Sequence, residues 1–293
     1  MKVFPCVIEK FLLDTYGNLT RVEELNGVNK EKGTSCFRLF FEEKTFIVKK
    51  AKEKREYDVY NAVSPFFEDK KISIPLVYYT YQEEGDYWFV IEDIPRHLPK
   101  DRWRGDREQI KLLFNLHFNT WNKTLNIDKP FDFSWDKELV KKSLFLLPSA
   151  LEEAIEQLYS KSETIFLPFC CISGDPNPTN WGIRNNGELV LFDWERIGYA
   201  SPAIDLAITI PSLGTLDKSL EFNIASTYIS FWKGVSIDFP YTVSELMRQI
   251  VIAKMWSALD FLVNNADTLE EDLLKLHITR LNEKFKVEYP DLI

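Results

Sequence analysis

The spacing of apolar residues changes near Pro95, and this change constrains the fold more than any other feature of the sequence. Before Pro95, short segments have the apolar character of strands, whereas most later segments repeat their apolar residues at helical spacing. A strand-rich part followed by a helical part is typical of an α+β protein with two lobes. The chain of 293 residues is long enough for both cores. We therefore predict a sheet-containing lobe at 1–94 and a mainly helical lobe at 95–293.

The first part reads as an antiparallel sheet with one inserted helix. Two short polar turns, at 42–44 and 83–86, each separate a pair of strand-like segments and predict two hairpins. In the inserted helix, Glu56, Tyr60 and Val63 fall on one stripe. The expected elements are a helix at 3–16, strands at 19–25, 36–41 and 45–50, a helix at 52–63, and strands at 76–82 and 87–91.

The second part reads as helices interrupted by one stretch of a different kind. At 165–193, short β segments surround a loop rich in Gly, Asn and Pro. The helices are expected at 106–125, 136–146, 149–161, 217–232, 242–265 and 268–285.

Composition excludes several classes of protein. A net charge of −9 argues against a nucleic-acid partner, which usually meets a basic face. The four Cys form no C-x-x-C pair and only three His are present, so a zinc site is not expected. No window approaches about 18 uncharged apolar residues, so no membrane span is expected. Glu9 and Lys10 lie where a signal peptide would need its apolar stretch, so no signal peptide is expected. The cysteine usage fits a reducing compartment, and a cytoplasmic location is predicted.

The interrupting stretch carries the chemistry. Asp175 lies in a loop after a β-like run, and Asn180 follows in the same loop. A turn at 185–187 then leads into the strand 189–192, which delivers Asp193 at its end. One hairpin thus brings two carboxylates and an amide together. Phosphoryl transfer needs this set: one carboxylate orients the acceptor hydroxyl, while the other and the amide oxygen hold Mg²⁺.

The motifs here resemble the phosphotransfer core of the aminoglycoside phosphotransferase/choline kinase superfamily, which has a protein-kinase-like fold of two lobes. They are Ser173-Gly174-Asp175, Asn180, Asp193-Trp194-Glu195 and Asp205-Leu206-Ala207. The resemblance implies that Asp175 is the catalytic base and that Asn180 and Asp193 bind Mg²⁺. It also implies that Asp205 braces the catalytic loop. Ser173 departs from the pattern, because the family has His there, and this puts the geometry of the loop in question.

The same resemblance directs attention to a charged stretch upstream. Lys49 ends an apolar run and matches the family's phosphate-binding Lys, with Lys50 expected on the other side of the sheet. Glu56 is the expected partner of Lys49, and Glu53 is the alternative. Without the downstream motifs, residues 49–56 would read as a solvated run of charges.

Two further segments of the first part are candidates for nucleotide contacts. The loop 26–35 would cover the phosphates through Gly33, Thr34 and Ser35, although it has no G-x-G-x-x-G pattern and also reads as an ordinary polar loop. Residues 88–95 resemble the family's hinge, where Glu92, Asp93 and Ile94 would meet adenine through backbone groups. The alternative interpretation of residues 88–95, without a role in nucleotide binding, is the end of an edge strand. Downstream, His117 matches a His that is structural in the family.

The expected activity is transfer of the γ-phosphate of ATP, with GTP as the alternative donor, to a hydroxyl of a small molecule. The family's acceptors include aminoglycoside antibiotics and amino alcohols, and the acidic balance of the chain favours a cationic one. A nucleotide- or partner-binding pseudokinase and a peptide kinase are the alternatives. The short interval from Asp193 to Asp205 leaves no room for a long activation segment, which argues against a peptide acceptor. The sequence indicates neither the acceptor nor an oligomeric state.

Overall fold

The computed structural model describes residues 4–25, 35–135, 137–211, 217–235 and 238–288. The chain forms two compact units, of which the first comprises 1–97, 125–131 and 179–197 and the second comprises 98–124, 132–178 and 198–293. The first change of unit thus falls just beyond the boundary expected at residue 94. The segment 179–197 returns to the first unit, which the sequence did not indicate. Within the described residues, no helix has the length and apolarity needed to cross a membrane.

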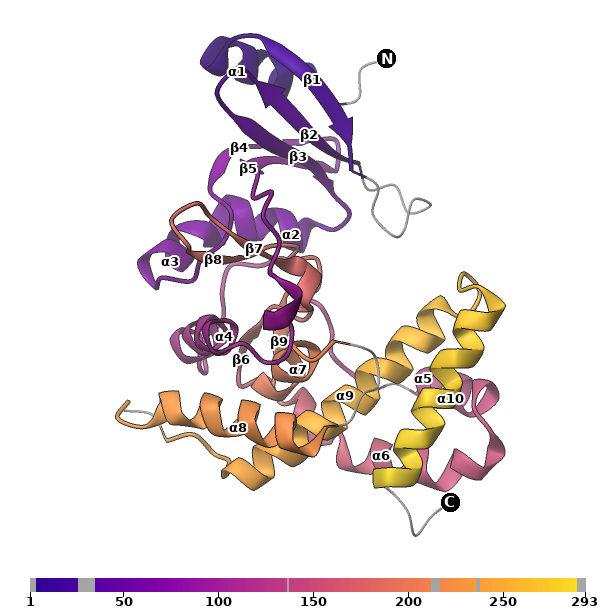
Figure 1. Ribbon diagram of the computed structural model, residues 1–293. Coiled ribbons are helices and arrows are strands. Elements are labelled where there is room, and N and C mark those ends of the chain that lie inside the picture. Colours follow the sequence, from indigo (N-terminus) through magenta and orange to yellow (C-terminus); the bar gives the residue numbers. More distant parts are fainter. Residues whose placement is uncertain (1–3, 26–34, 136, 212–216, 236–237, 289–293) are drawn as a thin grey trace. The chain divides into compact units, whose positions relative to one another are not determined.

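A five-stranded antiparallel sheet organises the first unit (Figure 1). Its strands are β1 Leu19–Glu24, β2 Cys36–Phe41, β3 Thr45–Ala51, β4 Val77–Glu83 and β5 Asp86–Glu92. Their order is β1-β2-β3-β5-β4, and both predicted hairpins, β2–β3 and β4–β5, are confirmed. Val48 lies at the centre, opposite Phe37 on β2 and Val90 on β5.

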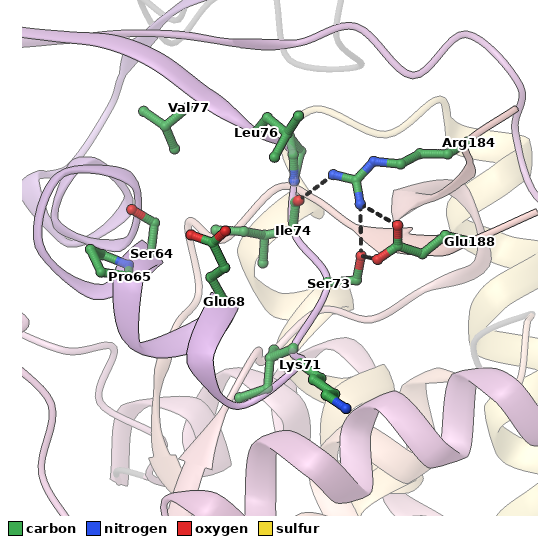
Figure 2. Close-up of a pocket in the computed structure, with 12 residues that line it drawn as sticks. Ser64, Pro65, Glu68, Lys71, Ser73, Ile74, Leu76, Val77, Arg184 and Glu188 are labelled. Atoms are coloured by element: carbon green, nitrogen blue, oxygen red, sulfur yellow. Dashed lines mark hydrogen bonds and ion pairs between the residues drawn. The ribbon is translucent and has the colours of Figure 1, made fainter. Parts of the chain in front are cut away.

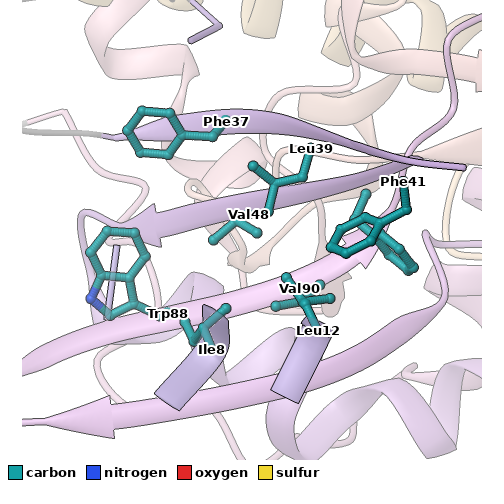
Figure 3. Close-up of a cluster of buried hydrophobic side chains, with 9 residues drawn as sticks. Ile8, Leu12, Phe37, Leu39, Phe41, Val48, Trp88 and Val90 are labelled. Atoms are coloured by element: carbon teal, nitrogen blue, oxygen red, sulfur yellow. The ribbon is translucent and has the colours of Figure 1, made fainter. Parts of the chain in front are cut away.

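Helix α1 (Cys6–Tyr16) covers one face of this sheet through its buried residues Ile8 and Leu12. Figure 3 shows Ile8 and Leu12 of α1 against Val48 and Val90 of the strands. All four side chains are buried. Full burial of such a side chain contributes roughly 1.5–3 kcal/mol, so this layer accounts for much of the stability of the unit.

A continuous helical segment packs against the unit's strand β5 from the other side. It consists of α2 (Lys54–Asp58), a π-helical turn η2 (Val59–Val63) and α3 (Ser64–Asp69). The ring of Tyr60 lies 4.4 Å from that of Phe89 on β5, centroid to centroid. The segment therefore extends beyond the helix predicted at 52–63. Pro65 would normally end an α-helix, but here it lies in the first turn of α3, where its missing N–H costs little.

A separate two-stranded hairpin completes the first unit. Its strands are β7 (Trp181–Ile183) and β8 (Leu189–Leu191), in register from Trp181↔Leu191 to Ile183↔Leu189. The Leu191 N–H donates to the carbonyl of Ser73, and the Ile183 N–H donates to that of Arg96. These bonds attach the hairpin to the segments on either side of the β4–β5 pair.

The second unit is mainly helical, as predicted. Its elements are η3 Lys100–Arg102, α4 Arg107–Asn119, α5 Lys137–Leu146, η4 Ser149–Leu151, α6 Glu152–Lys161, η5 Glu163–Phe166, β6 Cys170–Ile172, β9 Gly198–Ala200, α7 Pro202–Ile208, α8 Lys218–Trp232, α9 Val243–Asn265 and α10 Glu271–Glu288, while η6 Pro178–Asn180 spans the change of unit. Strands β6 and β9 pair antiparallel, and Cys170 and Cys171 are buried in β6 as small apolar strand residues. Helix α7 was not predicted, although its start is signalled: Ser201 caps it and Pro202 occupies its first position.

A group of charged side chains is buried among the last three helices. Glu221 of α8 and Lys254 of α9 form an ion pair with 3.7 Å between the nearest charged atoms. Lys284 of α10 is 6% exposed, and its Nζ has no hydrogen-bond partner within the described structure. Burial, reinforced by the charge of Lys254, lowers the pKa of Lys284 to about 7. Lys284 is therefore an excess positive charge beside a balanced pair, and it destabilises the fold at neutral pH.

We predict that Lys284→Met stabilises the protein at neutral pH by about 1–3 kcal/mol, because it removes the excess charge and keeps the apolar stem. Since the pKa of Lys284 is lowered on folding, the unfolded state binds more protons between about pH 7 and 10.5, and wild-type stability rises with pH there. The variant should lose the slope between about pH 7 and 8, whereas Lys254, whose pKa burial lowers to about 8, should still give a slope above pH 8. Urea denaturation across this range measures both effects, and Lys286→Met, an exposed change on the same helix, is the control. A variant less stable than wild type would contradict the account.

Candidate active site

Lys49 is the centre of the candidate site in the first unit. Side chains alternate along β3, so Lys49 points away from the α1 layer, and its Nζ contacts two carboxylates. The distances are 2.7 Å to Glu56 Oε1 and 2.8 Å to Asp193 Oδ1. Lys50 takes the opposite direction and pairs with Asp86 at 2.8 Å. The expected ion pair between Lys49 and Glu56 is thus formed.

Burial decides between the two acidic candidates for this pair. Glu56 is 1% exposed, whereas Glu53 is an exposed residue whose nearest cation is Arg55, at 3.9 Å. Burial raises the pKa of Glu56 to about 7, against the opposing charge of Lys49. Burial alone would lower the pKa of Lys49, but the charges of Glu56 and Asp193 outweigh it and raise that pKa. Lys49 is therefore held as a cation inside the unit.

Asp193 follows strand β8 and reaches Lys49 from the end of the hairpin β7–β8. Its φ of 64° is in the left-handed region, which side-chain-bearing residues seldom adopt and which commonly marks functional positions. The next residue, Trp194, is fully buried against Phe67 of α3, with ring centroids 5.1 Å apart. These neighbours hold the strained residue in place.

Asn180 lies at the same end of the hairpin as Asp193. Its carbonyl accepts the N–H of Phe192 at 3.0 Å, directly beside the Trp181↔Leu191 pair. One carboxylate and one amide oxygen suit hard Mg²⁺, which keeps several waters and takes phosphate oxygens as further ligands. The described residues contain no group of three or more His, Cys, Asp or Glu that could hold a metal by itself. The donor set therefore fits an ion that arrives with a phosphate ligand.

The loop that carries Asp175 belongs to the second unit, and Asp205 organises it. The Asp205 carboxylate accepts the Ser173 N–H at 2.9 Å and the Gly174 N–H at 2.8 Å. His117 Nε2 lies 3.1 Å from the same carboxylate, and the other ring nitrogen lies 3.0 Å from the hydroxyl of Tyr228. Asp205 thus has the contacts expected of a brace, and His117 has those of a structural residue.

Ser173 shows what the departure from the family pattern does locally. Its hydroxyl is buried and has no hydrogen-bond partner in the described part of the chain, but its backbone N–H makes the bond to Asp205. The brace therefore does not require a His side chain at this position. Beyond it, Asp175 is half-buried and its Oδ1 accepts a hydrogen bond from Asn177 Nδ2 at 2.9 Å.

The structure accordingly brings Lys49, Glu56 and Asp193 together, and sets Asn180 beside Asp193 on one hairpin. Asp175 belongs to the second unit. Of the expected phosphate loop, Gly33 and Thr34 lie outside the described residues. The carbonyl of Ser35 accepts the N–H of Lys50 at 2.8 Å.

The side chains of the expected hinge have structural partners. Glu92 binds Arg184, and the Asp93 carboxylate lies 2.9 Å from Arg38 Nε. Ile94 packs against Gly182, where an added Cβ would lie only 2.6 Å from Ile94 Cγ2. Any larger residue at 182 would push the hairpin away from the hinge. The side chains of Glu92, Asp93 and Ile94 are thus engaged within the first unit, and contact of this segment with adenine stays a prediction.

Two residues near the site had not been assigned to it from the sequence. Tyr60 was placed on the correct helix stripe, but its burial beside Glu56, which raises the pKa of its hydroxyl, was not foreseen. Arg184 gave no local signal, since its partner Glu92 is remote in the chain. Arg184 also lines a groove of about 500 Å³ between α3, residues 71–77 and the hairpin, shown in Figure 2.

Solved structures share this fold, although no protein-family model and no curated protein matches the sequence. The choline kinase LicA from Streptococcus pneumoniae matches with a TM-score of 0.61 and 16% identity, over 96% of this chain and 98% of that one. A thermostable aminoglycoside phosphotransferase APH(4)-Ia, solved with ADP and hygromycin B, gives 0.63 and 12%, over 96% and 99%. The ADP-bound phosphotransferase APH(2'')-Ib gives 0.56 and 16%, over 97% and 99%. At these identities the likeness establishes the fold, and the predicted kinase-like α+β architecture is confirmed.

We predict that Asp205→Asn destabilises the protein by about 3 kcal/mol or more, because two backbone N–H groups and His117 lose a buried carboxylate. Urea denaturation measures the loss. Hydrogen exchange at the amides of Ser173 and Gly174 should accelerate more than at distant sites. Asp267→Asn, an exposed change in the turn before α10, is the control. Exchange at the two amides unchanged from wild type would refute the bracing role.

Proposed function

We propose that this chain is an ATP-dependent phosphotransferase that moves the γ-phosphate to a hydroxyl of a small molecule. The observation that carries the proposal is the buried cluster of Lys49, Glu56 and Asp193, with Asn180 on the same hairpin as Asp193. Its fold is that of structures with bound ADP or AMP. Burying a lysine between two carboxylates, one of them partly exposed, costs desolvation free energy and is weak evidence for a purely stabilising role. Such charged clusters are common at functional sites.

Each residue of the cluster has a distinct role in this proposal. Lys49 neutralises the inner phosphates of ATP, and Glu56 fixes its direction. Asp193 and Asn180 would hold Mg²⁺, which neutralises charge on the phosphates when it is bound. Asp175 would orient the acceptor hydroxyl and take its proton. Asp205 acts on Asp175 only by fixing the backbone of the preceding residues.

The chain between Asp193 and Asp205 supports a small acceptor. Strand β9 begins at Gly198 and helix α7 at Pro202, so regular structure occupies the interval in which protein kinases carry an activation segment. The net charge of −9 favours an acceptor that bears an amino group, by electrostatic steering. Amino alcohols and aminocyclitol antibiotics are the classes to assay first, and ADP release is the readout.

We predict that Mg-ATP raises the melting temperature of the wild-type protein and that Asp193→Asn abolishes this shift, because the amide cannot replace the charge that binds the metal. Asp175→Asn should keep the shift and lower kcat by about 10²–10⁴, the usual effect of a positioned base. Differential scanning fluorimetry with and without Mg²⁺ provides the first test and ADP release the second. A wild-type protein with no Mg-ATP shift would overturn the proposed function.

The raised pKa of Glu56 predicts how kcat/KM of the proposed reaction falls at acid pH. Because burial raises that pKa to about 7, the Lys49–Glu56 pair is lost as pH falls through 7, and kcat/KM should fall with it. The contribution of Glu56 to folding has the opposite sign: it is greatest below about pH 4.5 and is lost as pH rises through 7. Glu56→Gln should have low kcat/KM without this limb. A limb near pH 7 that persists in Glu56→Gln would assign it to another group.

A further inference from the structure

Arg184 lies at the turn of the hairpin β7–β8, at the opposite end from Asn180 and Asp193. It directly follows β7, and its backbone closes the turn: its N–H donates to the carbonyl of Glu188 at 2.9 Å. The side chain is only 15% exposed and does not extend into solvent. It turns toward segments that are far from it in sequence.

The guanidinium of Arg184 joins three parts of the first unit. Nε lies 2.9 Å and 3.0 Å from the two carboxylate oxygens of Glu92, and Nη2 lies 2.6 Å from one of them. Nη2 also donates to the carbonyl of Ile74 at 2.9 Å, and Nη1 to the hydroxyl of Ser73 at 3.1 Å. Figure 2 shows the guanidinium between residues 73–74 and Glu188, which lies 2.8 Å from Nη1. The guanidinium of Arg184 thus connects the hairpin β7–β8 to the expected hinge at Glu92 and to the segment after α3 at Ser73 and Ile74.

The partners of Arg184 are themselves fixed. Glu92 ends β5, and its carboxylate accepts the Leu76 N–H at 3.1 Å. The Ser73 hydroxyl donates to Glu188 at 2.6 Å, and the Ser73 carbonyl accepts from the Leu191 N–H, two residues before Asp193. A displacement of the fork would therefore reach β8, the strand that delivers Asp193 to Lys49.

We propose that Arg184 is a positioning residue for phosphoryl transfer: by binding Glu92, Ser73 and Ile74, it fixes the hairpin that carries Asn180 and Asp193 against the hinge. This proposal rests on the proposed function for its kinetic consequence, but its geometric claim can be tested without nucleotide. The left-handed backbone at Asp193 needs such support, because a strained residue keeps its conformation only when its surroundings determine it.

Only arginine can make this set of contacts. Its planar fork binds both oxygens of Glu92 and still has donors for the Ser73 hydroxyl and the Ile74 carbonyl. Lysine has a single ammonium on a flexible stem and cannot reach all of them at once. Arg184→Lys therefore keeps the charge and removes the geometry, which separates positioning from simple electrostatics.

The first experiment is hydrogen exchange on the apo protein. In Arg184→Lys, the amides of Ile183 and Leu191 should exchange at least about 10-fold faster, while those of the sheet core, such as Val48, should not change. The control is Arg102→Lys, which alters another Arg–carboxylate fork, to Asp106 at 2.7 Å and 2.8 Å, in the second unit. Unchanged exchange at both hairpin amides in Arg184→Lys would overturn the proposal.

The second experiment measures kinetics well below the melting temperature of each variant. Arg184→Lys and Arg184→Gln should raise the Mg²⁺ concentration needed for half-maximal activity and lower kcat/KM by about 10–100-fold, as loss of support for a metal ligand usually does. Arg102→Lys should leave both values as in wild type. Wild-type values in Arg184→Lys, or equal losses in Arg102→Lys, would overturn the proposal. A wild-type protein without Mg-ATP binding would instead refute the proposed function, and the exchange result would still decide the role of Arg184.

Discussion

The ion cluster of Lys49, Glu56 and Asp193 sets conditions that the rest of the first unit must meet. A buried ammonium is stable only if carboxylates lie within contact distance, here 2.7 Å and 2.8 Å. Glu56 comes from a helix and Asp193 from a hairpin distant in sequence, so β3, α2 and β8 must be in fixed register with one another. Misplacing any one of them would leave a charge without its partner in the interior.

The hairpin β7–β8 is the element through which these conditions are met. It is short, and its own two-stranded ladder is weak support for two proposed metal ligands. The additional anchors are spread along its length: Trp194 under α3, Gly182 against Ile94, and Arg184 on Glu92. Together these contacts tie a short hairpin to three neighbouring segments, which is the kind of support that a site with a geometric demand on its ligands requires.

The sequence predicted the elements well where periodicity was strong and the pairing partners were close. Both hairpins of the sheet are of this kind, whereas the pairing of Lys49 with Glu56 was expected only from the family resemblance. The contact of Lys49 with Asp193, 144 residues away, was not predicted, since no local pattern encodes it. The same applies to Arg184 and Glu92. Contacts remote in sequence depend on the packing of whole elements, which neither spacing nor propensity specifies.

Two other differences have local physical causes. The sequence at Ser64-Pro65 ordinarily ends a helix, but the π-helical turn before it lets the helical segment continue to Asp69. Lys284 was not singled out from the sequence, and its side chain is buried in the structure near Glu221 and Lys254. Whether a lysine is solvated is decided by its neighbours in space, and a single sequence does not contain that information.

The left-handed backbone of Asp193 has a consequence for how this position can change over evolutionary time. Glycine would suit the backbone best there, and aspartate and asparagine are the side chains that tolerate it most readily. The left-handed backbone conformation therefore favours glycine, whereas metal binding favours a carboxylate. Aspartate tolerates the backbone conformation and also supplies the carboxylate. Relaxed selection for phosphoryl transfer would remove the need for a metal ligand at this position, but glycine would still leave Lys49 Nζ without one of its two carboxylate partners. The identity of residue 193 in related chains is thus a marker that distinguishes lineages that retain the chemistry from those that keep only the fold.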